Sequence, residues 1–129
     1  MMSEQAKIKT GDLSRAFWHG TTQGAFVLQR DVATGRSQFY PRAVNIFGEG
    51  TMDMQPASGG GKLIAVTTVR TPTPGFESPY VVGIVKLDEG PRVFARVVNA
   101  PEDLAPGRRM KIAWQSGDAD HRLFAFEPT

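Results

Sequence analysis

The fold is decided by one stretch, Pro72-Thr-Pro-Gly-Phe-Glu-Ser-Pro-Tyr80, Val81-Val-Gly-Ile-Val-Lys-Leu-Asp-Glu-Gly90 and Pro91-Arg-Val-Phe-Ala-Arg-Val-Val98. A proline-rich loop comes first, and two apolar runs follow, joined by the sequence Asp88-Glu89-Gly90-Pro91. Gly, Pro and Asp satisfy the backbone dihedrals of tight turns, so apolar runs on both sides of such a group predict a β-hairpin.

Three further segments predict strands around this hairpin. Residues 63–69 are nearly all apolar or β-branched, which predicts a strand covered on both faces. Residues 108–115 alternate between apolar and polar positions, as in a half-buried strand, and residues 123–126 form the last apolar run. Five strands, with a loop or short helix at residues 101–107 between the third and the fourth, match the small Greek-key barrel of the OB-fold.

Residues 12–20 predict a short helix. Leu13, Ala16 and Phe17 have the i, i+3, i+4 spacing of one helical face, and Asp12 and Gly20 are suited to its two ends. Such a helix is too short to be stable unless it docks on the rest of the domain.

The region between helix and barrel is unusual. Residues 24–30 and 37–40 predict two strands, whereas residues 41–61 are predicted to be mostly irregular. An irregular stretch of this length is rare inside a compact domain, so we expect a subdomain held by something other than a regular core.

The predicted fold class is mainly β, with a short N-terminal helix, a degenerate rubredoxin-like ribbon and a five-stranded OB-fold barrel. The expected boundaries are residues 1–22 for the helical segment, 23–60 for the ribbon-like subdomain and 61–129 for the barrel.

Composition excludes several classes of function. The 129 residues carry 15 basic and 13 acidic side chains, a net charge of +2 that does not favour nucleic-acid binding. The chain has no cysteine, which excludes disulfides, thiol nucleophiles and thiolate metal sites. Without a signal-peptide core or a long apolar run, the expectation is a soluble cytoplasmic protein away from membranes.

No catalytic constellation stands out, so we expect a protein that is not an enzyme. Of the two histidines, His19 lies on the predicted helix and His121 in a polar turn with Asp118 and Asp120. Turn formation explains these two carboxylates more simply than cation binding does. A small hydrolase or thioesterase using either histidine is a third, weaker hypothesis.

A phosphate-binding loop is also excluded. The glycines before Lys62 resemble one, but Pro56 stands where the pattern needs its first glycine, and Leu63 where it needs Ser or Thr. These glycines are expected to let the backbone turn into the barrel.

Single-stranded nucleic-acid binding is an alternative function, because OB barrels stack bases on aromatic rings along a basic groove. Phe94 and Arg96, with Arg70 and Lys86 on neighbouring strands, fit that hypothesis. Core packing for Phe94 and ordinary surface charge for the cations explain the same residues equally well.

Several short motifs, taken together in their order, carry a resemblance. They are Phe17-Trp-His-Gly20 with Gly24 and Leu28-Gln-Arg30, Phe39-Tyr-Pro-Arg42, Ser58-Gly-x-Gly61, Pro74-Gly-Phe-Glu-x-Pro-Tyr-Val-Val82 and Leu87-Asp-Glu-Gly90. The whole chain thereby resembles a bacterial and archaeal family that joins a rubredoxin-like zinc ribbon to an OB-fold. Its members accompany thiolase-like and other acyl-CoA enzymes.

One departure from that family concerns the metal. The family's two Cys-x-x-Cys knuckles fall here on Asp31 and Thr34, and on Asn45 and Gly48. This set cannot replace four thiolates, so we expect no zinc. The ribbon must then be held by a partner subunit or by aromatic packing from Phe26, Phe39, Tyr40 and Phe47.

The resemblance implies a non-catalytic accessory subunit that binds CoA or acyl-CoA, a thiolase-like or acyl-transfer enzyme, or both; it is also compatible with an oligomer. The candidates for phosphate contacts are Arg42, Lys62, Arg70 and Arg96, and those for adenine stacking or partner contact are Phe76 and Tyr80. Surface charge and aromatic packing are the simpler explanations for each.

Overall fold

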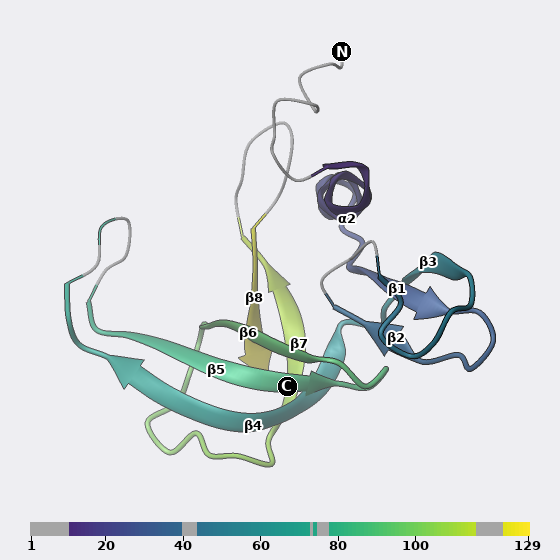
Figure 1. Cartoon of the computed structure of the whole chain (residues 1–129). Coiled ribbons are helices and arrows are strands. Elements are labelled where there is room, and N and C mark those ends of the chain that lie inside the picture. Colours follow the sequence, from purple (N-terminus) through teal and green to yellow (C-terminus); the bar gives the residue numbers. More distant parts are fainter. Residues whose placement is uncertain (1–10, 40–43, 73, 75–77, 116–122) are drawn as a thin grey trace. The chain divides into compact units, whose positions relative to one another are not determined.

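The computed structural model describes residues 11–39, 44–72, 74, 78–115 and 123–129. The chain divides into two compact units, both visible in Figure 1. The first contains the described residues up to Ser58 together with Leu123, and the second contains Gly59–Gln115 and Phe124–Thr129.

The first unit is one helix and a three-stranded antiparallel sheet. The helix α2 covers Gly11–Thr22, and the strands are β1 (Val27–Asp31), β2 (Ser37–Gln38) and β3 (Met52–Pro56), in the order β2-β1-β3. The predicted helix and the first two predicted strands are present, with somewhat different bounds. Within residues 41–61, predicted to be mostly irregular, the strand β3 was not predicted; it pairs with all five residues of β1.

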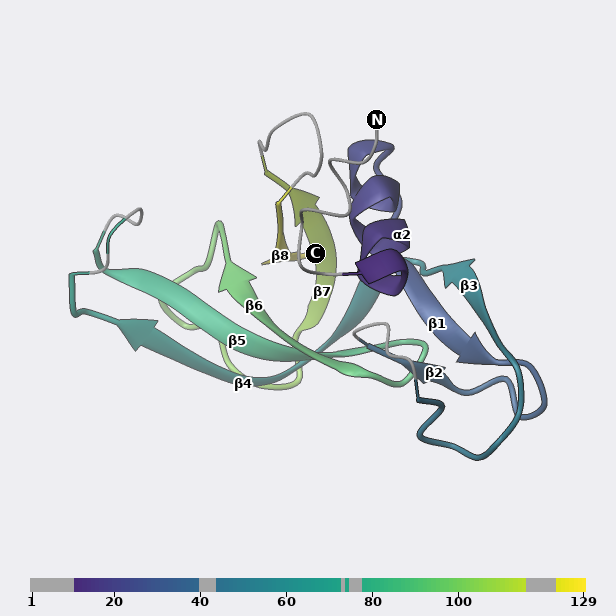
Figure 2. The same cartoon turned by 45° about the horizontal axis from the view of Figure 1, so that its top comes forward.

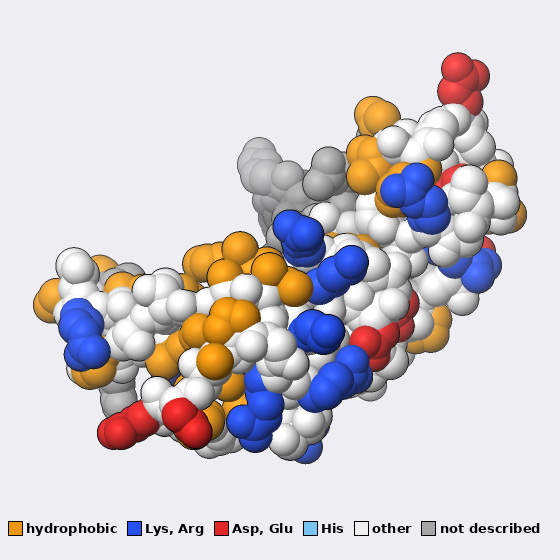
Figure 3. All heavy atoms as spheres, turned by 90° about the horizontal axis from the view of Figure 1, so that it is seen from below, with side chains coloured by type: hydrophobic (Ala, Val, Ile, Leu, Met, Phe, Trp, Pro, Cys, Tyr) orange, Lys and Arg blue, Asp and Glu red, His pale blue; other side chains and the backbone are white. Residues whose placement is uncertain are grey.

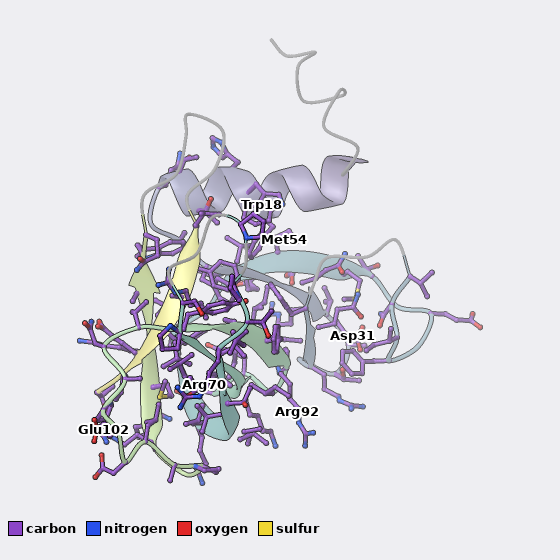
Figure 4. The ribbon with its side chains drawn as sticks, turned by 90° about the vertical axis from the view of Figure 1, so that its left-hand side faces the viewer. Trp18, Asp31, Met54, Arg70, Arg92 and Glu102 are labelled. Carbon is purple, nitrogen blue, oxygen red and sulfur yellow. The ribbon has the colours of Figure 1, made fainter. Side chains whose placement is uncertain are left out.

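Aromatic rings form the core of this unit. The ring of Phe17 on α2 is fully buried and lies 5.4 Å from those of Phe26 and Phe39, and these two are also 5.4 Å apart. Trp18 stands edge-on to Phe17 at 4.9 Å and points from the helix toward the sheet (Figure 4). The short helix is therefore stabilised by docking, as expected.

The second unit is a closed five-stranded barrel (Figure 2). Its strands are β4 (Gly60–Val69), β5 (Tyr80–Leu87), β6 (Arg92–Val97), β7 (Arg109–Trp114) and β8 (Phe124–Pro128). They close in the order β4-β5-β6-β8-β7, with β6 and β8 parallel and the other neighbours antiparallel. This is the predicted OB-fold.

The hairpin forms as its sequence predicts. The Leu87 N–H donates to the Pro91 carbonyl at 2.8 Å, and the Gly90 N–H donates to the Leu87 carbonyl at 2.9 Å. Gly90 has φ 116°, a value that L side chains rarely adopt, so the turn depends on this glycine. The turn sets the pairing of β5 with β6 from Lys86 and Arg92 onward.

Strand β4 departs from its prediction. Leu63 is buried, but Ala65, Thr67 and Thr68 are exposed, so the expectation of two covered faces was wrong. The register shifts between Leu63 and Ala65, and β4 pairs with β7 only over residues 60–62. Among the described strands, the second half of β4 is therefore paired with β5 alone.

The barrel interior is too tight for a side chain at Gly83. A Cβ added there would lie 2.8 Å from the Ala65 carbonyl oxygen and 3.0 Å from Leu63 Cδ1. The barrel core is otherwise formed by aliphatic side chains with Met110 and Phe126.

We therefore expect Gly83→Ala to destabilise the barrel by about 1–3 kcal/mol, because the backbone oxygen it meets cannot rotate away. Urea denaturation followed by circular dichroism measures this. Thr67→Ala, on the exposed side of β4, is the control and should change stability by less than about 0.5 kcal/mol. An equal effect of the two changes would contradict the tight interior.

Candidate functional site

Three cations lie in register across the outer surface of the barrel. Lys62 on β4 is paired with Lys86 on β5, and Lys86 is paired with Arg92 on β6. All three side chains are exposed. Neighbouring strands are about 4.8 Å apart, so the three positions span about 10 Å. On the other side of Lys62, β7 contributes Arg109, which forms a two-pronged salt bridge with Asp88 at 2.7 and 3.0 Å.

An apolar line runs beside the cations. Ala65, Ile84 and Phe94 occupy the next outward positions of β4, β5 and β6 and are again in register. Phe94 is 70% exposed, which excludes the core position considered for it. On the face seen from below, hydrophobic side chains gather beside a series of Lys and Arg side chains (Figure 3). The six residues Lys62, Lys86, Arg92, Ala65, Ile84 and Phe94 are termed the barrel face.

The barrel face is slightly hollowed. A depression of about 130 Å³ lies against Phe94 and Ile84 and is lined almost entirely by apolar atoms. A larger open depression, of about 420 Å³, lies between the second half of β4, Val81 and residues 100–104. No Lys or Arg lines the larger one, so it offers a phosphate group no cationic partner.

The predicted site residues do not converge on one point. Lys62 lies at the start of β4 and Arg70 follows its end, eight residues and roughly 26 Å of extended chain away. Arg70 and Tyr80 do belong together, because Val69 and Tyr80 are paired and the Ser78 hydroxyl donates to the Arg70 carbonyl at 2.8 Å. Arg96 is half-buried on β6, opposite Val82.

Two of the six candidates, Arg42 and Phe76, lie outside the described residues, as do Tyr40 and His121. Figure 4 labels Arg70, which follows the end of β4, and Arg92, the first residue of β6. Arg92 was not among the predicted site residues, although the turn at residues 88–91 is a sequence signal that aligns it with Lys86.

In the first unit, hydrogen bonds join three of the four positions that correspond to the zinc ligands of the family. These are Asp31 and Thr34 of the first knuckle and Asn45 of the second. The Asp31 carboxylate accepts from the Thr34 hydroxyl at 2.6 Å and from the Asn45 side-chain amide at 3.0 Å. Asn45 also donates to the Gly50 carbonyl at 3.0 Å and accepts from the Phe47 N–H at 2.9 Å. Figure 4 shows Asp31, which is 2% exposed, within the small sheet.

This donor set does not fit zinc. Both Asp31 oxygens are engaged by hydrogen-bond donors, the Asn45 amide nitrogen is itself a donor, and Gly48 has no side chain. Among the residues that the structure describes, no group of three His, Asp or Glu side chains is placed to hold a metal. The Thr34 hydroxyl and then the Asn45 amide hold the pKa of Asp31 below its ordinary value.

A buried glutamine fixes the loop that follows β2. The Gln38 amide donates to Gln29 Oε1 at 2.7 Å and to the Val44 carbonyl at 3.1 Å, and its oxygen accepts from the Ile46 N–H at 3.1 Å. The neighbouring Phe47 does not join the aromatic core; Arg36 lies over its ring, 4.2 Å from the centroid. Of the rings predicted to hold the ribbon, Phe26 and Phe39 do so.

The described histidine is not arranged for catalysis. His19 is exposed on α2, with its Nε2 atom 3.3 Å from the Gln23 side-chain amide nitrogen. The helix that carries it has twelve residues, and a bilayer-spanning helix is not found among the described residues.

The closed five-stranded barrel defines an OB-fold protein. A sequence profile of the ChsH2 C-terminal OB-fold domain matches residues 54–115. The solved "Ltp2-ChsH2(DUF35) aldolase" contains a chain that is 29% identical, with a TM-score of 0.77 over 92% of this chain and 97% of that one. The chain belongs to the DUF35/ChsH2 family, which joins an N-terminal rubredoxin-like region to a C-terminal OB-fold.

Curated relatives agree with this assignment. A "DUF35 domain-containing scaffold protein" of Pyrococcus furiosus is 41% identical over 58 residues, which are 43% of each chain. A "Probable enoyl-CoA hydratase alpha subunit" of Thermomonospora curvata is 31% identical over 117 residues, 88% of this chain. The chain spans only 37% of the length of the latter. A DUF35 structure from Sulfolobus solfataricus, 12% identical at a TM-score of 0.63 over 100% of this chain and 92% of that one, shares the fold.

The hydrogen-bonded knuckle leads to a stability prediction. Asn45→Ala removes three hydrogen bonds and leaves Asp31 Oδ1 without its donor, so we expect the first unit to lose about 1–3 kcal/mol. Urea denaturation followed by Trp18 fluorescence, in a Trp114→Phe background, measures the loss. Glu49→Ala, exposed in the same loop, is the control. A loss no larger than that of the control would show that the network is not needed for stability.

The same network predicts a pH dependence. Because the folded-state pKa of Asp31 is lowered, its contribution is complete above the unfolded-state pKa of about 4 and is lost as the pH falls through the lower, folded-state value. Asp53 and Asp88 also have lowered pKa values, through Arg30 and Arg109 respectively. We therefore compare wild type with Asp31→Asn, in which the Trp18 unfolding midpoint should fall less steeply below pH 4. Parallel pH profiles would contradict the assignment.

Proposed function

We propose that this protein is a non-catalytic accessory scaffold that binds a thiolase-like or related acyl-CoA enzyme. The barrel face carries the proposal, because it sets three cations, which have no acidic partner among the described residues, beside an exposed aromatic ring. Such a combination suits binding, and the described residues offer no nucleophile and base in contact. The names of its relatives support the enzyme class, since they refer to an aldolase complex, a hydratase subunit and scaffold proteins.

A contribution to CoA binding is a finer part of the proposal. Arg70 and Tyr80 lie at the same end of the β4–β5 pair, so a guanidinium for phosphate and a ring for adenine are available together. Lys62 is too distant to share that ligand, and Arg96 is half-buried. We assign CoA contact to the Arg70 end of the barrel and enzyme contact to the barrel face.

Single-stranded nucleic-acid binding is the second candidate, favoured by one observation. In OB-folds the outer face of the second and third strands binds oligonucleotides, and here that face carries Phe94 next to Lys86 and Arg92. Stacking platforms, however, use aromatic side chains for successive bases, whereas the barrel face holds a single ring. The accessory scaffold therefore explains the face better.

Association with purified enzymes tests the proposal. We expect at least one thiolase-like enzyme encoded in the same genome to co-elute with this protein in size-exclusion chromatography, with calorimetric binding in the micromolar range or tighter. CoA should bind that complex more weakly when Arg70→Ala and Tyr80→Ala are introduced, and Arg108→Ala is the control for loss of an exposed arginine. Failure of all such enzymes to bind would remove the accessory role.

A further inference from the structure

We infer that the enzyme docks on the barrel face and meets it with a row of carboxylates placed beside one projecting apolar side chain. This inference rests on the proposed function and adds to it the surface used and the chemistry of the partner.

The row formed by Lys62, Lys86 and Arg92 lowers the stability of the sheet. Like charges directly opposite each other on neighbouring strands destabilise a sheet, and here Lys86 has a cation opposite it on both sides. Any of these exposed positions could hold a neutral or acidic residue without disturbing the barrel core, because the side chains point to solvent. A repulsive row that contributes nothing to folding is explained by an anionic partner.

The described acidic side chains do not neutralise the row. Asp88, the acidic residue two positions after Lys86, is held by both terminal nitrogens of Arg109. No described acidic side chain forms an ion pair with Lys62, Lys86 or Arg92. The row therefore keeps its charge for a partner.

The volume of the hollow beside Phe94 distinguishes a protein partner from a small ligand. The hollow beside Phe94 measures about 130 Å³, whereas small-molecule sites measure roughly 300–1,000 Å³. A cavity of about 150 Å³ accommodates a benzene ring, so this hollow suits one aliphatic or aromatic side chain. Its lining is almost wholly apolar, which excludes a phosphate or ribose as the occupant.

Spacing specifies the partner further. The cations follow one another at the strand separation of about 4.8 Å, and residues three or four apart on a helix lie about 5–6 Å apart. A helix with carboxylates at such spacing and an apolar residue on the adjacent edge matches both lines of the barrel face. Opposite charges on the two surfaces would also speed association, most strongly at low salt.

The test uses the full chain and the thiolase-like enzyme found to bind it, with the affinity measured by calorimetry. Lys86→Glu and Phe94→Ala should each weaken binding at least tenfold. Lys111→Ala removes an exposed lysine of the neighbouring strand β7 and should leave the affinity unchanged. Wild-type affinity should also fall as salt is raised.

A second readout separates a docking surface from a structural role. Lys86→Glu replaces two repulsive pairs with attractive ones, so we expect it to raise Tm by about 1–4 °C while it weakens binding. A variant that binds poorly because it is unfolded would instead show a lowered Tm. Weak binding combined with a lowered Tm would overturn the inference.

The remaining outcomes are decisive too. Unchanged affinity in Lys86→Glu and Phe94→Ala would overturn the docking surface and leave the accessory role standing. Failure of every thiolase-like enzyme to bind wild type would overturn the accessory role and the inference with it. Salt-sensitive binding of a dT oligonucleotide that is lost in Lys86→Glu would assign the barrel face to nucleic acid instead. Binding of CoA that is lost in the same variant would assign the barrel face to CoA.

Discussion

The barrel depends on the seam formed by residues 59–63, where β4 is held between two other strands. The Ile112 N–H donates to the Gly59 carbonyl at 2.8 Å, and the Asp88 N–H donates to the Gly60 carbonyl at 3.0 Å. A Cβ added at Gly61 would lie 2.5 Å from the Lys86 carbonyl oxygen, so the close approach requires glycine. The same seam places Lys62 between Arg109 and Lys86. Barrel closure and the cation row are therefore two consequences of one local geometry.

The first unit is a ribbon-like sheet without thiolate ligands, so its loops must be held together without a metal centre. A metal ion would join two distant loops through four strong bonds, whereas here a buried carboxylate joins them through a hydroxyl and an amide. Gln38 adds a second link to the later loop, and the Phe17 cluster joins the sheet to the helix. Several weak contacts thus replace one strong centre, and a substitution at any one of them leaves the others in place.

How far the sequence predicts this structure differs from segment to segment. The hairpin was predictable because Asp88 to Pro91 can form little other than a turn, and the helix because three apolar residues share one face. Strand β3 was missed because Met52–Pro56 contains no β-branched or aromatic residue; its pairing with β1 determines its conformation. The cation row was missed because register across strands is a tertiary property, which a list of Lys and Arg positions does not contain.

The net charge of the chain likewise did not predict the cation row. The net charge of +2 did not favour nucleic-acid binding, but net charge averages over the whole chain. Described carboxylates are engaged by other cations, Asp53 by Arg30, Asp88 by Arg109 and Glu127 by Lys111. This distribution leaves Lys62, Lys86 and Arg92 together beside Phe94. A partner responds to the electrostatic field of these three cations because charges beyond about 10 Å are screened by salt. A nearly neutral protein can therefore carry a strongly cationic docking surface.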